Sequence, residues 1–216
     1  MLKISPSLLA ANFAALESEI KRVEDGGAEW LHLDVMDGAF VPNISFGPCV
    51  ISSLRRGSGM FFDVHLMINE PVRYLADYKK AGADGITVHL EACSDVRATL
   101  LAIKELGVKC GLSIKPATPV SALIPYIELC DTVLIMTVEP GFGGQKLIPE
   151  TVGKIKEVSE LCKAKGLDVE IEADGGITPD NIAPLVANGL TVAVAGSAVF
   201  KAEKPAEAIA GLKGNK

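Results

Sequence analysis

The chain contains three histidines, and each of them falls late in a short apolar segment. His32, His65 and His89 lie in WLHLDV, FFDVHLM and DGITVHL, in that order. Imidazole binds metal ions and carries protons near neutral pH. A single histidine is more often a core or surface residue, but three in equivalent positions indicate a functional site.

Two aspartates accompany these histidines. Asp34 follows His32 by two residues, so both side chains share one face of a strand, and Asp174 ends the segment EIEAD. Two imidazoles and two carboxylates suit one divalent ion of intermediate hardness, such as Zn, Fe(II), Mn or Co. The predicted ligands are His32, Asp34, His65 and Asp174. The alternative is that both aspartates cap turns, and no compact motif such as HExxH supports the metal independently.

Glycine-containing segments follow three later apolar runs. They are Gly141–Gly144 with Phe142 between the glycines, the pair Gly175 and Gly176, and the pair Gly196 and Ser197. Exposed N–H groups in such loops bind phosphate, and glycine lets the backbone approach the anion closely. One such pair is an ordinary turn, but three in succession favour a phosphate site. The spacing matches neither a Walker A loop nor a dinucleotide fingerprint.

Eight strand segments alternate with helix segments and must position these residues. We expect strands at 3–7, 30–35, 61–67, 84–90, 108–114, 131–138, 168–173 and 191–195. We expect helices near 13–26, 48–56, 71–82, 94–106, 119–128, 149–165, 179–188 and 205–213. This alternation indicates a parallel sheet, and eight units close a TIM (β/α)8 barrel. We therefore predict an α/β fold with one barrel domain over 1–216. An open doubly wound sheet is the alternative, although the first turn lacks its glycines.

Barrel active sites lie at the carboxyl ends of the strands, where these residues fall. The longest loop, 36–47, is a candidate lid. Ser7 is either a substrate contact or a turn residue, and Lys115 is a Schiff-base lysine or, more simply, a solvated one. Three methionines at strand ends fit gap-filling core and a soft lining over a reacting centre equally well. They are Met36, Met67 and Met136.

Composition narrows the class of protein. The net charge is -6 and Lys and Arg are scattered, which argues against a nucleic-acid partner. No apolar run approaches the roughly 20 residues of a membrane span, so we expect no membrane partner. The five cysteines form no CxxC pair, and no targeting peptide is evident at the start. We expect a cytoplasmic location and a homo-oligomer, and the glycine-containing loops indicate a small phosphorylated substrate.

Five segments resemble the ribulose-phosphate 3-epimerase family. They are HLDVMDGAFVPN (32–43), HLM (65–67), MTVEPGFGGQ (136–145), ADGGI (173–177) and GSAVF (196–200). The resemblance runs from PSLLAANF near the start to the last expected helix. It implies a TIM barrel that interconverts D-ribulose 5-phosphate and D-xylulose 5-phosphate.

The resemblance also implies residue roles. His32, Asp34, His65 and Asp174 would hold the metal, and Asp34 and Asp174 would be the two acid/base groups. Substrate contacts would come from Ser7, His65, Gly141, Phe142, Gly143, Gly144, Asp174, Gly175, Gly176, Gly196 and Ser197. Two departures from the family pattern, Ala173 and Lys115, touch none of the implied ligands.

The chemistry agrees with these residue types. Epimerisation beside a ketone removes a proton from one face of carbon and returns one on the other, so two flanking carboxylates suit it. A divalent ion stabilises the ene-diolate that forms between the two steps. An acid or base works best with a pKa near the operating pH. We therefore expect burial, or the charge of each aspartate on the other, to raise the pKa values of both Asp34 and Asp174. The alternatives are an allulose-6-phosphate 3-epimerase, a metal-free phosphoribosyl isomerase or lyase barrel, and a non-catalytic sugar-phosphate sensor.

Overall fold

The computed structural model describes residues 2–214, which contain eight strands in one parallel sheet. The strands are β1 (Lys3–Pro6), β2 (Trp30–Met36), β3 (Phe61–Met67), β4 (Gly85–His89), β5 (Lys109–Ile114), β6 (Thr132–Met136), β7 (Glu170–Asp174) and β8 (Val192–Ala195). Each strand pairs with its neighbour in sequence from β2 to β8, and β8 pairs with β1. A parallel bridge between Ser7 and His32 joins β1 to β2 and closes the sheet. The predicted TIM barrel is therefore confirmed.

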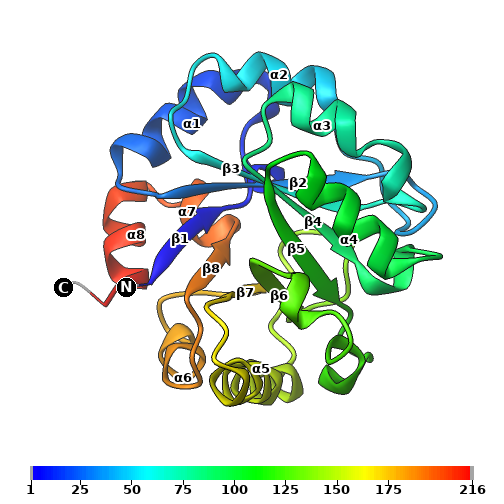
Figure 1. Cartoon of the computed structure of the whole chain (residues 1–216). Helices are drawn as coiled ribbons and strands as arrows, with labels where there is room; N and C mark the ends of the chain where they lie inside the picture. The colour runs from blue at the N-terminus through cyan, green and yellow to red at the C-terminus, as the bar shows by residue number, and fades with distance from the viewer. Residues whose placement is uncertain (1, 215–216) are drawn as a thin grey trace.

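Helices form a ring around the strands (Figure 1). Within residues 2–214 they are α1 (Leu16–Asp25), α2 (Pro48–Arg55), α3 (Leu75–Ala81), α4 (Val96–Glu105), α5 (Val152–Lys165), α6 (Ile182–Ala187), α7 (Ser197–Phe200) and α8 (Pro205–Leu212). The predicted span of 1–216 also includes Met1, Asn215 and Lys216, which lie outside the described residues.

One predicted helix is wrong. Residues 119–128 form two short 3₁₀ turns, Val120–Leu123 and Ile127–Leu129, instead of an α-helix. Pro125 lies between them, and a proline there removes a backbone donor that a continuous α-helix needs. The short helix α7 was not predicted, because four residues are too few for a recognisable apolar period.

The two faces of the barrel strands differ in polarity. Leu31, Leu33 and Val35 of β2 belong to the main apolar cluster, which also includes helix residues such as Ile20 and Leu100. The alternate residues of β2 point the other way, into the barrel, where His32 approaches β7 across the interior. Several polar side chains are buried on this inner face. They include Ser5, His32, Asp34, Asp63, His65, Thr87, His89, Ser113 and Glu172. TIM barrels usually fill this space with branched apolar residues, so the polar interior marks the site.

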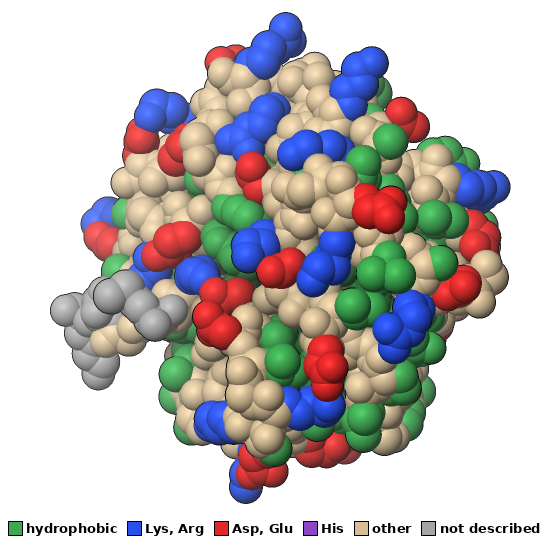
Figure 2. All heavy atoms as spheres, in the orientation of Figure 1, with side chains coloured by type: hydrophobic (Ala, Val, Ile, Leu, Met, Phe, Trp, Pro, Cys, Tyr) green, Lys and Arg blue, Asp and Glu red, His purple; other side chains and the backbone are tan. Residues whose placement is uncertain are grey.

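Charged side chains are dispersed on the outer surface. Lys and Arg alternate with Asp and Glu on the face shown in Figure 2, with no extended area of one sign. All three histidines are fully buried, and none is visible on that face. No helix among the described residues has the length and apolar character to cross a membrane.

Candidate active site

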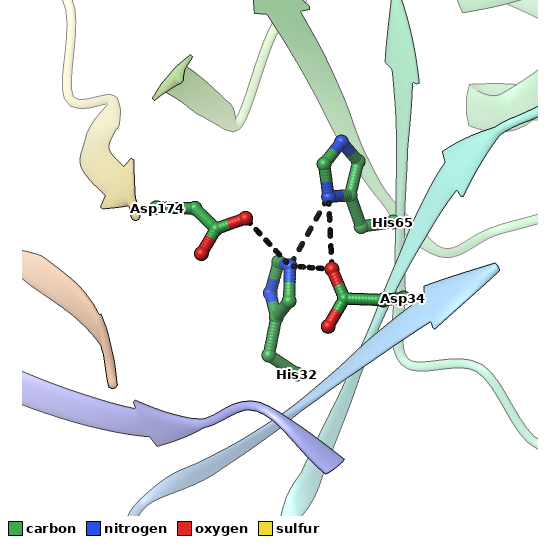
Figure 3. Close-up of side chains that lie close together, drawn as sticks. All are labelled: His32, Asp34, His65 and Asp174. Atoms are coloured by element: carbon green, nitrogen blue, oxygen red, sulfur yellow. Dashed lines mark hydrogen bonds and ion pairs between the residues drawn. The ribbon is translucent and has the colours of Figure 1, made fainter. Parts of the chain in front are cut away.

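Four side chains from three strands converge at the carboxyl end of the barrel. The Nε2 atom of His32 is 3.4 Å from Asp34 Oδ1 and 3.9 Å from Asp174 Oδ2. It is also 3.2 Å from Nδ1 of His65, which in turn lies 3.6 Å from Asp34 Oδ1 (Figure 3). The predicted quartet is thus brought together, and β7 contributes its member from across the barrel.

The donor set fits a divalent metal ion. The four ligand atoms lie within 4.8 Å of one another. Bonds of about 2.0–2.2 Å from nitrogen and oxygen to a shared ion require separations of this order between donors. Two imidazole nitrogens and two carboxylate oxygens suit zinc and the neighbouring transition metals better than calcium or magnesium. These side chains could therefore hold such an ion without a large rearrangement.

Two further carboxylates lie below this cluster. Nδ1 of His32 is 2.6 Å from Asp63 Oδ2 and 3.5 Å from Glu172 Oε1, and all three side chains are buried. The bond from Nδ1 to Asp63 fixes the ring with Nε2 directed at the cluster. Burial and the Asp63 charge raise the pKa of Glu172 well above its usual range. Sequence reasoning missed both residues, although each lies two positions before a predicted ligand and therefore on the same strand face.

Asp34 is fixed by contacts on two sides. The Ser7 hydroxyl donates to its Oδ2 at 2.5 Å, next to the bridge that closes the barrel. The Ser45 hydroxyl donates to the Asp34 backbone carbonyl at 2.5 Å and accepts from the Met36 backbone at 3.0 Å. Ser45 therefore ties the far end of the loop 37–47 back to β2. Ser7 is bonded to a predicted catalytic group rather than serving only a turn.

The two aspartates differ in ionisation. Burial acts to raise the pKa of Asp34, but His32 and His65 outweigh it and hold that pKa well below its usual range. Burial and the Asp34 charge raise the pKa of Asp174 to about 7, against the opposing effect of His32. The expectation of a raised pKa is thus confirmed for Asp174 and wrong for Asp34. Pairs of carboxyl groups with separated pKa values are typical of acid/base sites.

The histidine pKa values are also separated. Burial acts to lower the pKa of His32, but the charges of Asp34 and Asp63 raise it well above the ordinary value. Burial lowers the pKa of His65 to about 4 and also lowers that of His89. His65 is therefore a neutral imidazole with a free lone pair at physiological pH, the form that binds metals.

A cleft of about 560 Å³ lies over the cluster and is large enough for a small phosphorylated sugar. Every predicted substrate-binding residue except His65 lines it, namely Ser7, Gly141, Phe142, Gly143, Gly144, Asp174, Gly175, Gly176, Gly196 and Ser197. His65 is fully buried beneath the cleft, so its contact with the sugar stays a prediction.

The three glycine loops meet on one side of this cleft. Asn43 of the loop 37–47 donates to the Gly141 carbonyl at 2.8 Å, and Gln145 donates to the Phe142 carbonyl at 2.9 Å. Gly176 has φ +67°, and a Cβ there would lie 2.3 Å from the Leu147 backbone nitrogen. Only glycine fits that position without moving the backbone. At the glycine positions the main chain therefore lies directly against the cleft.

The remaining candidates are resolved by their contacts. Met36, Met67 and Met136 are at most 4% exposed and also line the cleft, so the core and lining interpretations both apply. Lys115 places its Nζ 4.0 Å from the centre of the Phe40 ring and does not line the cleft, which argues against a Schiff base. His89 is outside the ligand quartet and lies behind His65.

A TIM barrel with converging imidazoles and carboxylates and a glycine-lined cleft at the carboxyl ends of its strands is typical of a barrel enzyme. The chain belongs to the ribulose-phosphate 3-epimerase family, whose sequence profile matches residues 3–200. It is 48% identical over 215 residues to a ribulose-phosphate 3-epimerase from Synechocystis sp., covering 99% of this chain and 94% of the relative. It is 47% identical over 217 residues to the Bacillus subtilis ribulose-phosphate 3-epimerase, covering both chains completely. The chain is therefore an isomerase.

Solved structures with low sequence identity share the fold. KGPDC from Streptococcus mutans superposes with a TM-score of 0.75 at 13% identity, covering 99% of this chain and 96% of that one. A 3-hexulose-6-phosphate synthase superposes with a TM-score of 0.67 at 17% identity, covering 99% and 98%. These structures support the barrel architecture and carry no argument about the reaction.

Proposed function

We propose that this chain interconverts D-ribulose 5-phosphate and D-xylulose 5-phosphate by inverting carbon 3. The observation that carries the proposal is the convergence of Asp34 and Asp174 on one imidazole with pKa values shifted in opposite directions. Carbon 3 lies next to the C2 ketone, so its proton is acidic enough for removal by a carboxylate. Family membership supports the same reaction.

In one direction, ionised Asp34 takes the C3 proton from one face of the substrate. Asp174, whose pKa is raised to about 7 in the metal-free protein, delivers a proton to the opposite face of the ene-diolate. After turnover Asp34 carries a proton and Asp174 is ionised, which is the arrangement required for the reverse direction. Ser7 stabilises the ionised form of Asp34 by donating to Oδ2.

The proposed metal site consists of His32, Asp34, His65 and Asp174, holding one ion of Zn, Fe(II), Mn or Co. When bound, the ion would supply positive charge that stabilises the ene-diolate, a contribution of several kcal/mol in comparable enzymes. Asp63 supports this assignment because it orients His32 from the other ring nitrogen at 2.6 Å. A metal-free phosphoribosyl isomerase would have no use for this convergence.

The phosphate group is proposed to lie among Gly141–Gly144, Gly175, Gly176, Gly196 and Ser197. Side-chain amides hold these loops by donating to their carbonyls, as Asn43 does to the Gly141 carbonyl. Phe142 is 55% exposed and is free to cover a bound sugar. Ser7 and His65 are assigned to the sugar end of the cleft, nearest the carboxylates.

We also propose one catalytic domain over 1–216, a cytoplasmic location and a homo-oligomeric state. Free thiols at all five cysteines support a reducing compartment. Relatives carry both locations in their names, a cytoplasmic isoform from Oryza sativa and a chloroplastic enzyme from Arabidopsis thaliana, so fractionation of the source cells is the test. Light scattering on the purified protein tests the oligomer.

The decisive experiment is an epimerisation assay on purified protein. D-Ribulose 5-phosphate is supplied, D-xylulose 5-phosphate is measured, and D-allulose 6-phosphate is tested in parallel. Rapid conversion of the pentulose phosphate is expected. Preference for allulose 6-phosphate would reassign the substrate, and turnover of neither sugar would favour a sensor over an enzyme.

A further inference from the structure

The third histidine contacts one of the proposed ligands from behind. His65 directs Nδ1 at the cluster, while its Nε2 atom lies 2.9 Å from Nε2 of His89. The other ring nitrogen of His89, Nδ1, is 3.3 Å from Oε2 of Glu91. A chain of hydrogen bonds therefore runs from a loop carboxylate through two imidazoles to the cluster.

The donor and acceptor of each hydrogen bond in this series follow from the carboxylate at its Glu91 end. An ionised carboxylate can only accept, so Nδ1 of His89 must carry the proton that it donates to Glu91. A neutral imidazole has one N–H, which leaves Nε2 of His89 as an acceptor. His65 must then donate from Nε2, so its Nδ1 keeps a lone pair that faces the cluster. Nε2 of His32, 3.2 Å from this lone pair, favours the same tautomer by donating to it, so the carboxylate and His32 support one arrangement from opposite ends.

Glu91 is itself held in place. Its Oε1 atom accepts from the Lys115 backbone N–H at 2.8 Å and from the Thr118 hydroxyl. These two donors leave Oε2 for His89, and the Glu91 side chain is only 21% exposed. Both imidazoles are fully buried, so solvent does not compete for their nitrogens. The Phe40 ring packs 4.9 Å from the His89 ring, centre to centre, which restricts its rotation.

We propose that Glu91 and His89 are positioning residues that fix the tautomer of His65 and thereby prepare its Nδ1 atom as a metal ligand. This inference rests on the metal site of the proposed function. Each imidazole ligand then has a carboxylate behind it. His32 bonds to Asp63 directly, and His65 reaches Glu91 through His89. Loss of such an outer partner typically weakens metal binding about 10–100-fold.

Glu91→Gln makes a sharp test because the geometry predicts how the amide is oriented. The Gln oxygen is expected at the Oε1 position, where Lys115 and Thr118 donate. The amide NH₂ then faces Nδ1 of His89, so Nδ1 must accept and Nε2 must donate. Donor and acceptor are thus exchanged in each hydrogen bond of the series. The proton of His65 moves to Nδ1, where it blocks the metal. The matched control is Glu70→Gln, because Glu70 accepts from Ser94 in a neighbouring loop and its side chain bonds to none of the histidines.

The first measurement is the tautomer itself. With only three histidines, ¹⁵N-labelled protein gives three resolvable rings in long-range ¹H–¹⁵N spectra. In metal-free wild-type protein we expect the His65 proton on Nε2 and the His89 proton on Nδ1, with both reversed in Glu91→Gln. A wild-type His65 protonated on Nδ1 overturns the proposal, whether or not the variant folds.

The second measurement is Co(II) affinity, by competition with a chromophoric chelator, together with the visible d–d spectrum. Glu91→Gln should raise the dissociation constant about 10–100-fold and alter the spectrum, while Glu70→Gln matches wild type. Equal affinity in all three proteins overturns the positioning role. Failure of the proposed function would instead appear as an absence of epimerisation in wild-type protein and would leave the tautomers unchanged.

Discussion

Asp34 and Asp174 approach the same atom of His32 from opposite sides, at 3.4 and 3.9 Å from Nε2 (Figure 3). They come from β2 and β7, which are not neighbours in the sheet. Ser7 and two imidazoles keep Asp34 ionised, whereas burial and the Asp34 charge raise the pKa of Asp174. The two carboxyl groups thus differ in ionisation at the same pH, as the proposed inversion by one base and one acid requires.

Metal dependence is the first prediction. Dialysis against a strong chelator should abolish epimerisation, and one equivalent per chain of a suitable divalent ion should restore it. The reason is that four ligand atoms from three strands lie within 4.8 Å of one another and form a donor set that suits one divalent ion. Metal content by mass spectrometry is measured with each rate. Full activity in protein shown to contain no metal would contradict the site.

The phosphate group should supply much of the binding energy. Free D-ribulose is expected to turn over far more slowly than its 5-phosphate, because remote binding energy supports the reacting end of the substrate. Comparable kcat/KM for both sugars would eliminate the phosphate site.

Gly176→Ala tests the loop directly. A Cβ there would lie 2.3 Å from the Leu147 backbone nitrogen, at a φ of +67°, so the loop must shift. We expect kcat/KM for the phosphorylated sugar to fall at least tenfold, with little change for the free sugar. The control is Gly153→Ala in α5, where no atom lies within 4 Å of the added carbon. An equal loss for both sugars would mean that the substitution damages the whole barrel.

Asp174 should make the stability of metal-free protein depend on pH. Its pKa is about 7 when folded against 3.8 unfolded, so between these values the folded chain holds a proton that the unfolded chain lacks. Stability therefore falls as pH rises from about 4 to 7. Asp174→Asn removes this effect and should stabilise the metal-free protein at pH 8 by up to roughly 4 kcal/mol, at 1.36 kcal/mol per pKa unit.

Urea denaturation in the presence of chelator measures this difference at several pH values. The advantage of Asp174→Asn over wild type should shrink steadily below pH 7 and be absent below about pH 4. Asp180→Asn, which changes an exposed carboxylate in the loop that follows, serves as the control. An Asp174→Asn advantage that is the same at pH 5 and pH 8 would refute the raised pKa.

Much of the site could be predicted because strand parity is a local property. His32 and Asp34 share a face whatever the fold, and the alternation of eight segments determines that Asp174 reaches the same end of the barrel. The orienting groups were harder to find. Asp63 reaches His32, and His89 reaches His65, from the next strand of the sheet, and only the strand register brings these pairs together. Pro125 indicates a break in the helix predicted at 119–128, but the spacing of apolar residues around it also fits a helix.

The last prediction concerns the two proton carriers. Replacing either Asp34 or Asp174 by Asn leaves one carboxylate in place, so epimerisation should fall about 10²–10⁴-fold in each variant. Each variant should still exchange the C3 proton of one epimer with deuterated solvent, and the two variants should act on opposite epimers. Both residues are also proposed ligands, so metal content is measured first and rates are compared only between metal-replete proteins. If metal-replete Asp174→Asn epimerises at the wild-type rate, inversion does not use two carboxylates, and Asp174 serves the metal alone.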